Sequence, residues 1–208
     1  MGDYMFSTLK AGGIIMLPII LCGIIATFII IERCYYFYII KKRDIKLMFD
    51  LKNLLDEKNF EEAKQVCQNA DTPCSQVIKK ALDCRTWDEK DMKDAVEAEM
   101  TAVVPRFEHL LTGLGTISNI STLLGLLGTV TGNIKAFGVL GGGGTMGDPA
   151  LLAGAIAEAL VTTVAGLVVS IPSVIFYNYF VSRVNRRISE MESNVTNVLI
   201  KITGRVKQ

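Results

Sequence analysis

The sequence predicts an all-α integral membrane protein with three transmembrane helices and long cytoplasmic helical extensions. Half of its 208 residues are hydrophobic, whereas only 21% are charged. The charges are also unevenly distributed, because residues 113–182 contain only Lys135, Asp148 and Glu158. This pattern excludes a disordered chain, a nucleic-acid-binding protein that relies on overall basicity, and an ordinary soluble globule.

The first apolar stretch predicts a transmembrane helix over residues 11–40, preceded by a periplasmic N-terminus over residues 1–10. Residues 11–31 carry no charge, and about 20 apolar residues are enough to cross the hydrocarbon core of a bilayer. A cleaved signal peptide is the competing interpretation, but such a peptide has a basic start and a shorter apolar run that ends in small residues. Here the run ends at Glu32-Arg33, which aromatic and then basic residues follow. We therefore expect an uncleaved span.

Two further stretches predict transmembrane helices over residues 110–140 and 150–183, joined by a periplasmic Gly-rich loop over residues 141–149. Lys135 is the only charge in the first of them, and Glu158 is the only charge in the second before its last residue. As a helix the second stretch would be about 50 Å long, which exceeds a hydrocarbon core of about 30 Å. We therefore expect it to tilt or to project beyond the bilayer.

Lysine and arginine residues predict the orientation of the chain. Basic residues follow the first span at Lys41–Arg43 and the third at Arg183–Arg187, whereas the loop over 141–149 has none. Because short cytoplasmic segments carry an excess of lysine and arginine, we expect the N-terminus in the periplasm. Residues 41–109 and 184–208 are then cytoplasmic.

The cytoplasmic domain over residues 41–109 has the pattern of several helices. Asn59 followed by Glu62 resembles a capping box, which marks the start of a helix. From Asp88 onward, apolar residues recur at a spacing of three and four up to Leu110, as on one face of a helix. We expect this helix to run directly into the second span.

Residues 184–208 predict an amphipathic cytoplasmic helix that continues the third span. This helix would carry its apolar residues on one face and charged residues outside it. The stripe suits packing against the helices of the cytoplasmic domain and suits a contact with another subunit equally well, so both interpretations stay open. Its members are Val184, Ile188, Met191, Val195, Val198 and Ile202.

No group of residues is typical of a metal site, a cofactor site or an enzyme active centre. The spacing of the cysteines matches no zinc motif, and we expect Cys67, Cys74 and Cys84 to be reduced, buried and hydrophobic in role. His109, the only histidine, has no cysteine or acidic partner at the spacing of metal ligands or of a catalytic triad. We expect no metal, no cofactor and no conventional enzymatic activity.

Glu158 is the residue that most clearly suggests chemistry. An ionised acid at the centre of a span costs roughly 2.5–3.5 kcal/mol on insertion scales, so such residues usually face a bundle interior and serve ion or proton pathways. Gly154, Thr162 and Gly166 fall on the same helical face, and Thr163 borders it. The alternative interpretation is that Glu158 merely sits near the outer membrane interface.

The second span has a matching stripe of small and polar residues. Such a stripe lets membrane helices approach closely, and threonine hydroxyls can bond back to their own helix. Packing does not explain why a carboxylate and several hydroxyls converge in spans that are otherwise nearly uncharged, which is how a proton-accepting cavity would be lined. The stripe consists of Ser118, Ser121, Gly125, Gly128, Thr129 and Gly132. The residues expected to serve helix packing are Gly125, Gly128, Gly132, Gly154, Gly166 and Pro172.

Two longer motifs resemble those of the MotA/TolQ/ExbB proton-channel family, nearest to its ExbB/TolQ branch. The first is GLLGTVTG over Gly125–Gly132, which Ala136-Phe137 follows, and the second is AIAEALVTTVAGL over Ala155–Leu167, with Ile171-Pro172 and Tyr177-Asn178 after it. The resemblance covers essentially the whole chain. The MotA branch has four spans, so the three expected here argue against a flagellar stator.

The resemblance implies a proton-channel subunit rather than an enzyme. Matched residue by residue, the pore-lining threonine of the second span falls on Thr129, the carboxylate of the third span on Glu158 and the threonine of the third span on Thr163. Thr162 joins this proton-pathway set because it shares the face of Glu158. The chain departs from the family at Ser121-Thr122, where Ala-Pro is common.

The resemblance also implies partners. Members of this family form a ring, typically a pentamer, in the bacterial inner membrane, and the ring encloses the single span of an ExbD/TolR-like protein. Proton flow would then act through that partner on a TonB-like protein and energise TonB-dependent outer-membrane transport. The alternatives are a TolQ-like envelope-integrity motor, a gliding motor, and a non-conducting membrane scaffold. We expect contact with membrane lipids and no nucleic-acid partner.

Overall fold

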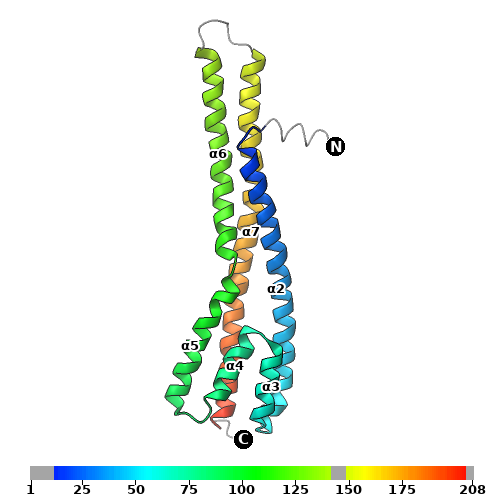
Figure 1. Ribbon diagram of the computed structural model, residues 1–208, viewed down its shortest axis with the longest axis vertical. Helices are drawn as coiled ribbons and strands as arrows, with labels where there is room; N and C mark the ends of the chain where they lie inside the picture. The colour runs from blue at the N-terminus through cyan, green and yellow to red at the C-terminus, as the bar shows by residue number, and fades with distance from the viewer. Residues whose placement is uncertain (1–11, 142–148, 205–208) are drawn as a thin grey trace. The chain divides into compact units, whose positions relative to one another are not determined.

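The computed structural model describes residues 12–141 and 149–204, and every regular element within these ranges is a helix (Figure 1). Apolar residues at helical spacing and the lack of any Gly-Pro turn signal within the long stretches account for the length of these helices. The elements are α2 (Met16–Asp56), α3 (Phe60–Ala70), α4 (Pro73–Asp83), α5 (Glu89–Glu108), α6 (Leu111–Gly141) and α7 (Pro149–Ile202).

Three helical stretches are long and apolar enough to cross a membrane, namely Met16–Asp56, Glu89–Gly141 and Pro149–Ile202. Many large hydrophobic side chains on these stretches are exposed, among them Leu17 and Phe28 of α2. An apolar surface of this extent is unfavourable in water and favourable in lipid. The prediction of an all-α chain with three long apolar helices is therefore confirmed for the described residues.

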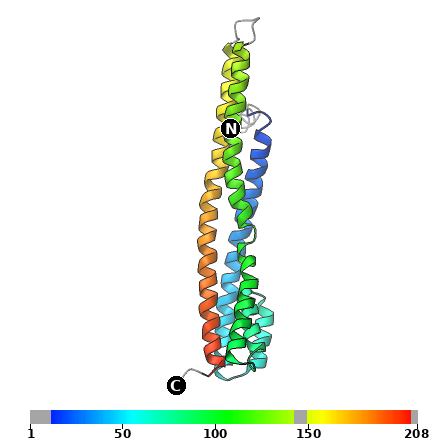
Figure 2. The same ribbon diagram turned by 90° about the vertical axis from the view of Figure 1, so that its left-hand side faces the viewer.

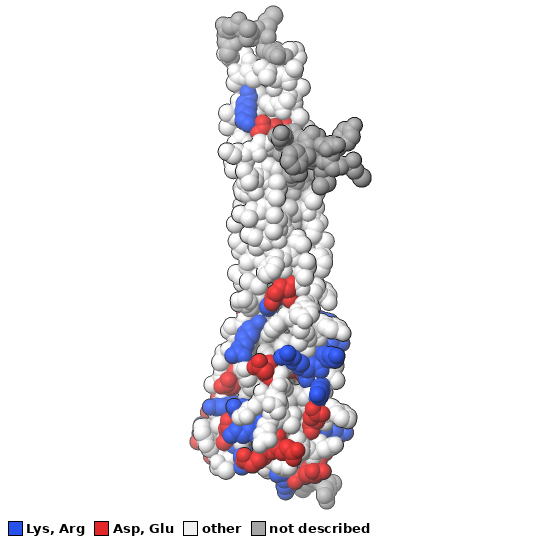
Figure 3. All heavy atoms as spheres, turned by 45° about the vertical axis from the view of Figure 1, so that its right-hand side comes forward, with Lys and Arg blue, Asp and Glu red and all other residues white. Residues whose placement is uncertain are grey.

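The chain forms two compact units. The apolar unit comprises the described residues within 1–31 and 110–179, and the charged unit comprises those within 32–109 and 180–208. Helices α2 and α7 each contribute one part to each unit. Most lysine, arginine, aspartate and glutamate side chains lie on the charged unit, and the surface of the apolar unit is almost free of them (Figure 3). This separation follows the uneven distribution of charge along the sequence.

Within the apolar unit, α6 and the N-terminal part of α7 lie side by side, as both ribbon views show (Figures 1 and 2). Glycines allow this close approach. A Cβ atom added to Gly125 would lie 3.3 Å from the Thr163 Cα, and one added to Gly166 would lie 2.5 Å from the backbone oxygen of Ser121. The two backbones are therefore closer than side chains at these positions would permit.

In the charged unit, α3 and α4 form a short hairpin whose helix starts are capped by side chains. The Asn59 side chain accepts a hydrogen bond from the Glu62 amide and donates another to the Glu62 carboxylate. Thr72 and Ser75 form a full capping box at the start of α4, with Pro73 in the first turn. The predicted cap at Asn59 is thus confirmed, but Glu62 reaches the Asn59 side chain instead of its backbone.

The helix is interrupted between α5 and α6. Helix α5 ends at Glu108, α6 begins at Leu111, and Leu110 adopts a φ of 65°. A left-handed conformation interrupts the helical ladder and is unfavourable for a side chain of this size. The prediction that the helix after Asp88 runs directly into the second span is therefore wrong at His109 and Leu110. The apolar spacing continues through these residues although the helical backbone does not.

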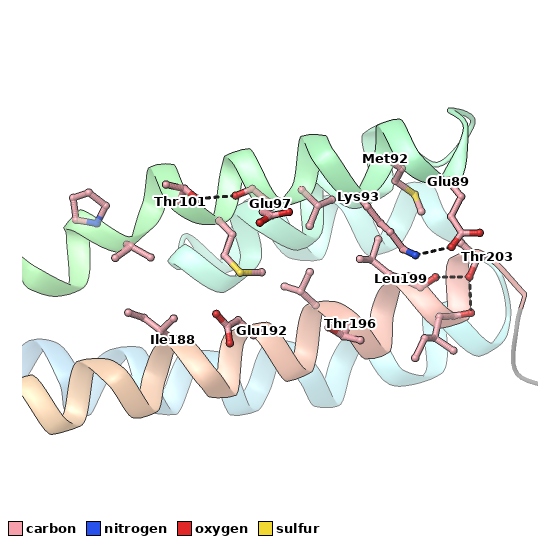
Figure 4. Close-up of a pocket in the computed structure, with 16 residues that line it drawn as sticks. Glu89, Met92, Lys93, Glu97, Thr101, Ile188, Glu192, Thr196, Leu199 and Thr203 are labelled. Carbon is pink, nitrogen blue, oxygen red and sulfur yellow. Dashed lines mark hydrogen bonds and ion pairs between the residues drawn. The ribbon is translucent and has the colours of Figure 1, made fainter.

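The apolar stripe of the tail packs inside the charged unit. Val184, Met191, Val195 and Val198 are buried there, so the packing interpretation is confirmed for these residues. Other residues of the tail line a groove of about 800 Å³ between α5 and α7, where Ile188 lies opposite Thr101 and Leu199 lies opposite Lys93 (Figure 4). The contact with another subunit stays a prediction.

The cysteines of α3 and α4 behave as hydrophobic core residues. Cys67, Cys74 and Cys84 are buried, and none of the five cysteines forms a disulfide within the described residues. Burial raises the pKa of Cys67 and of Cys74 to about 12. Both thiols therefore stay protonated at neutral pH, which disfavours a role as nucleophile or metal ligand.

Candidate proton-pathway site

The apolar unit contains an ion pair between α6 and α7. Lys135 of α6 donates a hydrogen bond to the Glu158 Oε1 atom of α7 over 2.6 Å. These are the only charged side chains among the described residues of this unit. The Glu158 side chain is 25% exposed, against 57% for Lys135. The carboxylate thus lies partly buried in an apolar environment, where its partner offsets the cost of its charge.

The start of α2 lies against the same carboxylate. Gly13 has a φ of 64°, and a Cβ atom added to it would collide with the Glu158 carboxylate. Only glycine combines this positive φ with so close an approach. Glu158 of α7 therefore contacts two other segments, because Lys135 approaches it from α6 and Gly13 from just before α2.

Two threonines follow Glu158 at the interface of α7 with α6. The Thr163 hydroxyl lies 2.9 Å from the Gly125 backbone oxygen of α6 and 3.1 Å from the Ala159 oxygen of its own helix. Thr162 is buried, and its hydroxyl donates within α7 to the backbone oxygen of Glu158 or Ala159. The Thr163 hydroxyl can therefore exchange its single hydrogen between a partner on each helix, whereas that of Thr162 is satisfied locally.

Thr129 differs from these two residues. Its hydroxyl donates to the Leu126 backbone oxygen over 2.6 Å, within α6. Within the described residues, no hydrogen bond joins this hydroxyl to α7. The structure thus brings Glu158, Thr162 and Thr163 together along one interface and leaves the Thr129 hydroxyl bonded to its own helix.

The expected packing residues also divide into two groups. Added Cβ atoms on Gly128 and Gly132 would collide with Thr162 and Ala159, so both glycines lie directly beneath α7, as Gly125 does. Gly154, in contrast, has no described atom within 4 Å of such a Cβ. Pro172 lies inside α7 without ending the helix, as membrane helices permit.

Sequence reasoning missed two features of this interface. The pairing of Lys135 with Glu158 is not among the predictions, although a single cation and a single anion in neighbouring spans are a signal for pairing. Ser170 was not considered, yet its hydroxyl accepts a hydrogen bond from Thr122 of α6 over 2.7 Å. The buried Ser121 hydroxyl of α6 has no hydrogen-bond partner among the described residues.

The chemistry available at this interface is proton exchange and hydrogen bonding. The described residues contain no group of three potential metal ligands. The interface has a carboxylate with a cationic partner, and hydroxyl groups that can both donate and accept. These groups can hold or transfer a proton in a region that otherwise offers few polar atoms.

Known proteins resemble this chain over most of its length. The profile of the MotA/TolQ/ExbB proton channel family matches residues 69–193. An ExbB-like biopolymer transport protein from Synechocystis is 34% identical over 171 residues, which are 82% of this chain and 81% of that protein. The biopolymer transport protein ExbB of Neisseria meningitidis is 28% identical over 77% of each chain. The Tol-Pal system protein TolQ of Haemophilus influenzae is 31% identical over 70% of this chain and 56% of its own length.

Proposed function

This chain belongs to the MotA/TolQ/ExbB proton channel family, and from this premise we propose that it is the channel subunit of a proton-driven motor of the cell envelope. The observation that carries the proposal is Glu158, a carboxylate held between α6 and α7 in an otherwise apolar unit. Its relatives are named for biopolymer transport and for the Tol-Pal system. Biopolymer transport is accordingly the process we assign to this multi-pass membrane protein.

In the proposed assembly, several copies form a ring, most simply a pentamer, in the bacterial inner membrane around the single span of an ExbD/TolR-like protein. The N-terminus lies in the periplasm, and the charged unit lies in the cytoplasm. The partner passes work to a TonB-like protein and so energises TonB-dependent outer-membrane transport. The chain itself is not an enzyme in this scheme.

Protons supply the energy in this mechanism. A membrane potential contributes about 2.3 kcal/mol per proton for each 100 mV, and a pH difference contributes about 1.4 kcal/mol for each unit. Glu158 accepts a proton only when its carboxylate gives up the ion pair with Lys135. The Thr163 hydroxyl, five residues further along α7, then offers a polar contact. Thr129 is assigned to the same pore lining through the family motif.

Glu158→Gln and Thr163→Val test this proposal. Glutamine preserves the shape of the side chain but removes its charge, and valine preserves the shape of threonine but removes the hydroxyl. We expect both variants to assemble with their partner and to lose proton flux, measured with a pH-sensitive dye in liposomes that contain the purified complex. Glu192→Gln and Thr101→Val, two exposed positions of the charged unit, are the matched controls and should conduct normally.

The outcomes separate the candidate functions. Unchanged proton flux in both Glu158→Gln and Thr163→Val would contradict the assignment of the proton pathway to this interface. A wild-type complex that retains its partners but conducts no protons would support the non-conducting scaffold. If protons flow, the periplasmic domain of the copurified partner distinguishes TonB-linked transport from a TolQ-like or gliding motor.

A further inference from the structure

A pocket of about 620 Å³ that combines charged side chains with an apolar wall lies in the charged unit, beside the residues that directly follow the first apolar stretch. Three arginines from two helices line it, Arg33 and Arg43 of α2 and Arg106 of α5, and His109 joins them. The acidic residues at this pocket are Glu32 and Asp71. The arginines outnumber the carboxylates by one, so the pocket has a net positive charge even when His109 is neutral.

Arg33 is the buried charged residue of this pocket. Its side chain is 4% exposed. Its Nε and Nη2 atoms donate to the Glu32 carboxylate, and its guanidinium lies 4.4 Å from the centre of the Tyr36 ring. The third nitrogen, Nη1, is buried and has no hydrogen-bond partner among the described residues. A buried donor without an acceptor is unfavourable by about 1–3 kcal/mol, so Arg33 is a buried positive charge that Glu32 satisfies only in part.

Arg43 and Arg106 add two further cations. Both are exposed, and neither forms an ion pair with a described residue. Their guanidinium groups carry donors in a planar arrangement that matches phosphate oxygens. The Asp71 carboxylate would repel an anion bound in this pocket. Its single negative charge is outnumbered by the positive charges of Arg43 and Arg106, to which the partly neutralised Arg33 adds. The chemistry of the pocket therefore favours a phosphate group.

The surroundings indicate where such a phosphate comes from. The pocket begins at Glu32, the first charge after an apolar stretch long enough to cross a bilayer core. Tyr35 and Tyr36 line it together with Ile39 and Pro105, and tyrosines concentrate at the level of lipid headgroups. A soluble phosphate compound gains nothing from this apolar wall, whereas the glycerol and upper acyl chain of a lipid can pack against it.

We propose that this pocket binds the headgroup phosphate of an anionic membrane phospholipid. Arg43 and Arg106 hold the phosphate oxygens, Arg33 supplies the buried positive charge, and the tyrosines and Ile39 contact the glycerol region. The site would fasten the end of α5 to α2 at the membrane surface. The proposal requires only that the chain spans the membrane, so it does not depend on proton conduction.

The test is native mass spectrometry of the delipidated full-length protein, titrated with phosphatidylglycerol or with phosphatidylcholine. We expect the wild-type chain to retain phosphatidylglycerol over phosphatidylcholine. The double variant Arg43→Gln/Arg106→Gln should bind phosphatidylglycerol at least tenfold more weakly, as the loss of two charge-assisted hydrogen bonds implies. The matched control is Lys42→Gln/Lys46→Gln, which removes the same charge at two exposed residues of α2 outside the pocket.

Each outcome decides the question. Equal binding of phosphatidylglycerol by the double variant and its control would overturn the proposal, because general surface charge would then explain the affinity. Displacement of the lipid by inorganic phosphate at comparable concentration would show a site for free phosphate and overturn the lipid assignment. Arg33→Lys is a second variant that keeps the charge and loses the planar donors, and we expect an intermediate affinity for it. Circular dichroism should report wild-type helix content for all variants.

Discussion

At the scale of single residues, the pairing of Lys135 with Glu158 changes how the carboxylate is understood. A lone acid within a span is costly, whereas a paired one is partly compensated, and here the two partners are 23 positions apart on different helices. The pair keeps the unit close to neutral while it preserves a group that can accept a proton. Lys135 is therefore the counter-charge of the carboxylate on which the function proposed above depends.

Lys135→Met should destabilise the protein. The substitution leaves the Glu158 carboxylate without its cation, and we expect a loss of about 1–3 kcal/mol, between the values for exposed and for fully buried pairs. Thermal unfolding of the full chain in detergent measures the effect. Lys135→Met/Glu158→Met should recover most of the lost stability, because no charge then remains in the apolar unit. Equal destabilisation by the single and double variants would show that the ion pair is not the cause.

At the scale of elements, the interface of α6 with α7 depends on which glycines face the neighbouring helix. Gly125, Gly128 and Gly132 are spaced so that they lie along one side of α6, and Gly166 meets that side from α7. Their lack of side chains brings the backbone oxygen of Gly125 within reach of the Thr163 hydroxyl. The same close approach that packs the helices therefore also positions one of the candidate proton-pathway groups.

Gly166→Ala should disrupt this interface. The new methyl group would meet the backbone oxygen of Ser121 at 2.5 Å, and a backbone atom cannot move aside as a side chain can. Overpacking of this kind costs about 1–3 kcal/mol, which a lower midpoint of thermal unfolding in detergent would reveal. Gly154→Ala and Gly138→Ala are matched controls on α7 and α6 with open space around them, and a comparable loss in either would contradict this explanation.

At the scale of the whole molecule, the apolar unit contains the candidate proton pathway and the charged unit contains the lipid pocket and the groove beside the tail. Large hydrophobic side chains remain exposed in the apolar unit on all three long helices, including Leu123, Phe137 and Val168. In a single chain these residues have only lipid to contact. In the proposed ring, those of α6 and α7 would meet neighbouring subunits and the span of the partner.

Gentle detergent purification of the tagged chain from its native membranes, followed by mass spectrometry, tests the assembly. We expect an oligomer accompanied by a substoichiometric small protein that has one span with one acidic residue in it. Such a protein would satisfy the partner requirement of the motor. A homo-oligomer that is reproducibly free of any such protein would favour the scaffold and would leave the partly buried charge of Glu158 without a partner to exchange protons with.

Much of this protein can be predicted from local sequence patterns. The chargeless run over 11–31 and its counterparts around Lys135 and Glu158 predict three long apolar helices, because length and apolarity are properties of a continuous segment. The motifs over Gly125–Gly132 and Ala155–Leu167 are likewise local, and they were sufficient to indicate the family. The sequence by itself thus determined the helical class, the apolar segments and the family.

Tertiary structure decided which faces meet. Helical periodicity places Thr163 beside the face of Glu158 but does not say that Gly125 will accept its hydrogen bond. In the same way, no local pattern brings Arg106 of α5 to a pocket with Arg33 of α2, or shows that the apolar spacing near Leu110 crosses a backbone break. These features depend on contacts between segments far apart in the chain. Such contacts form, and contribute their free energy, only when the helices pack.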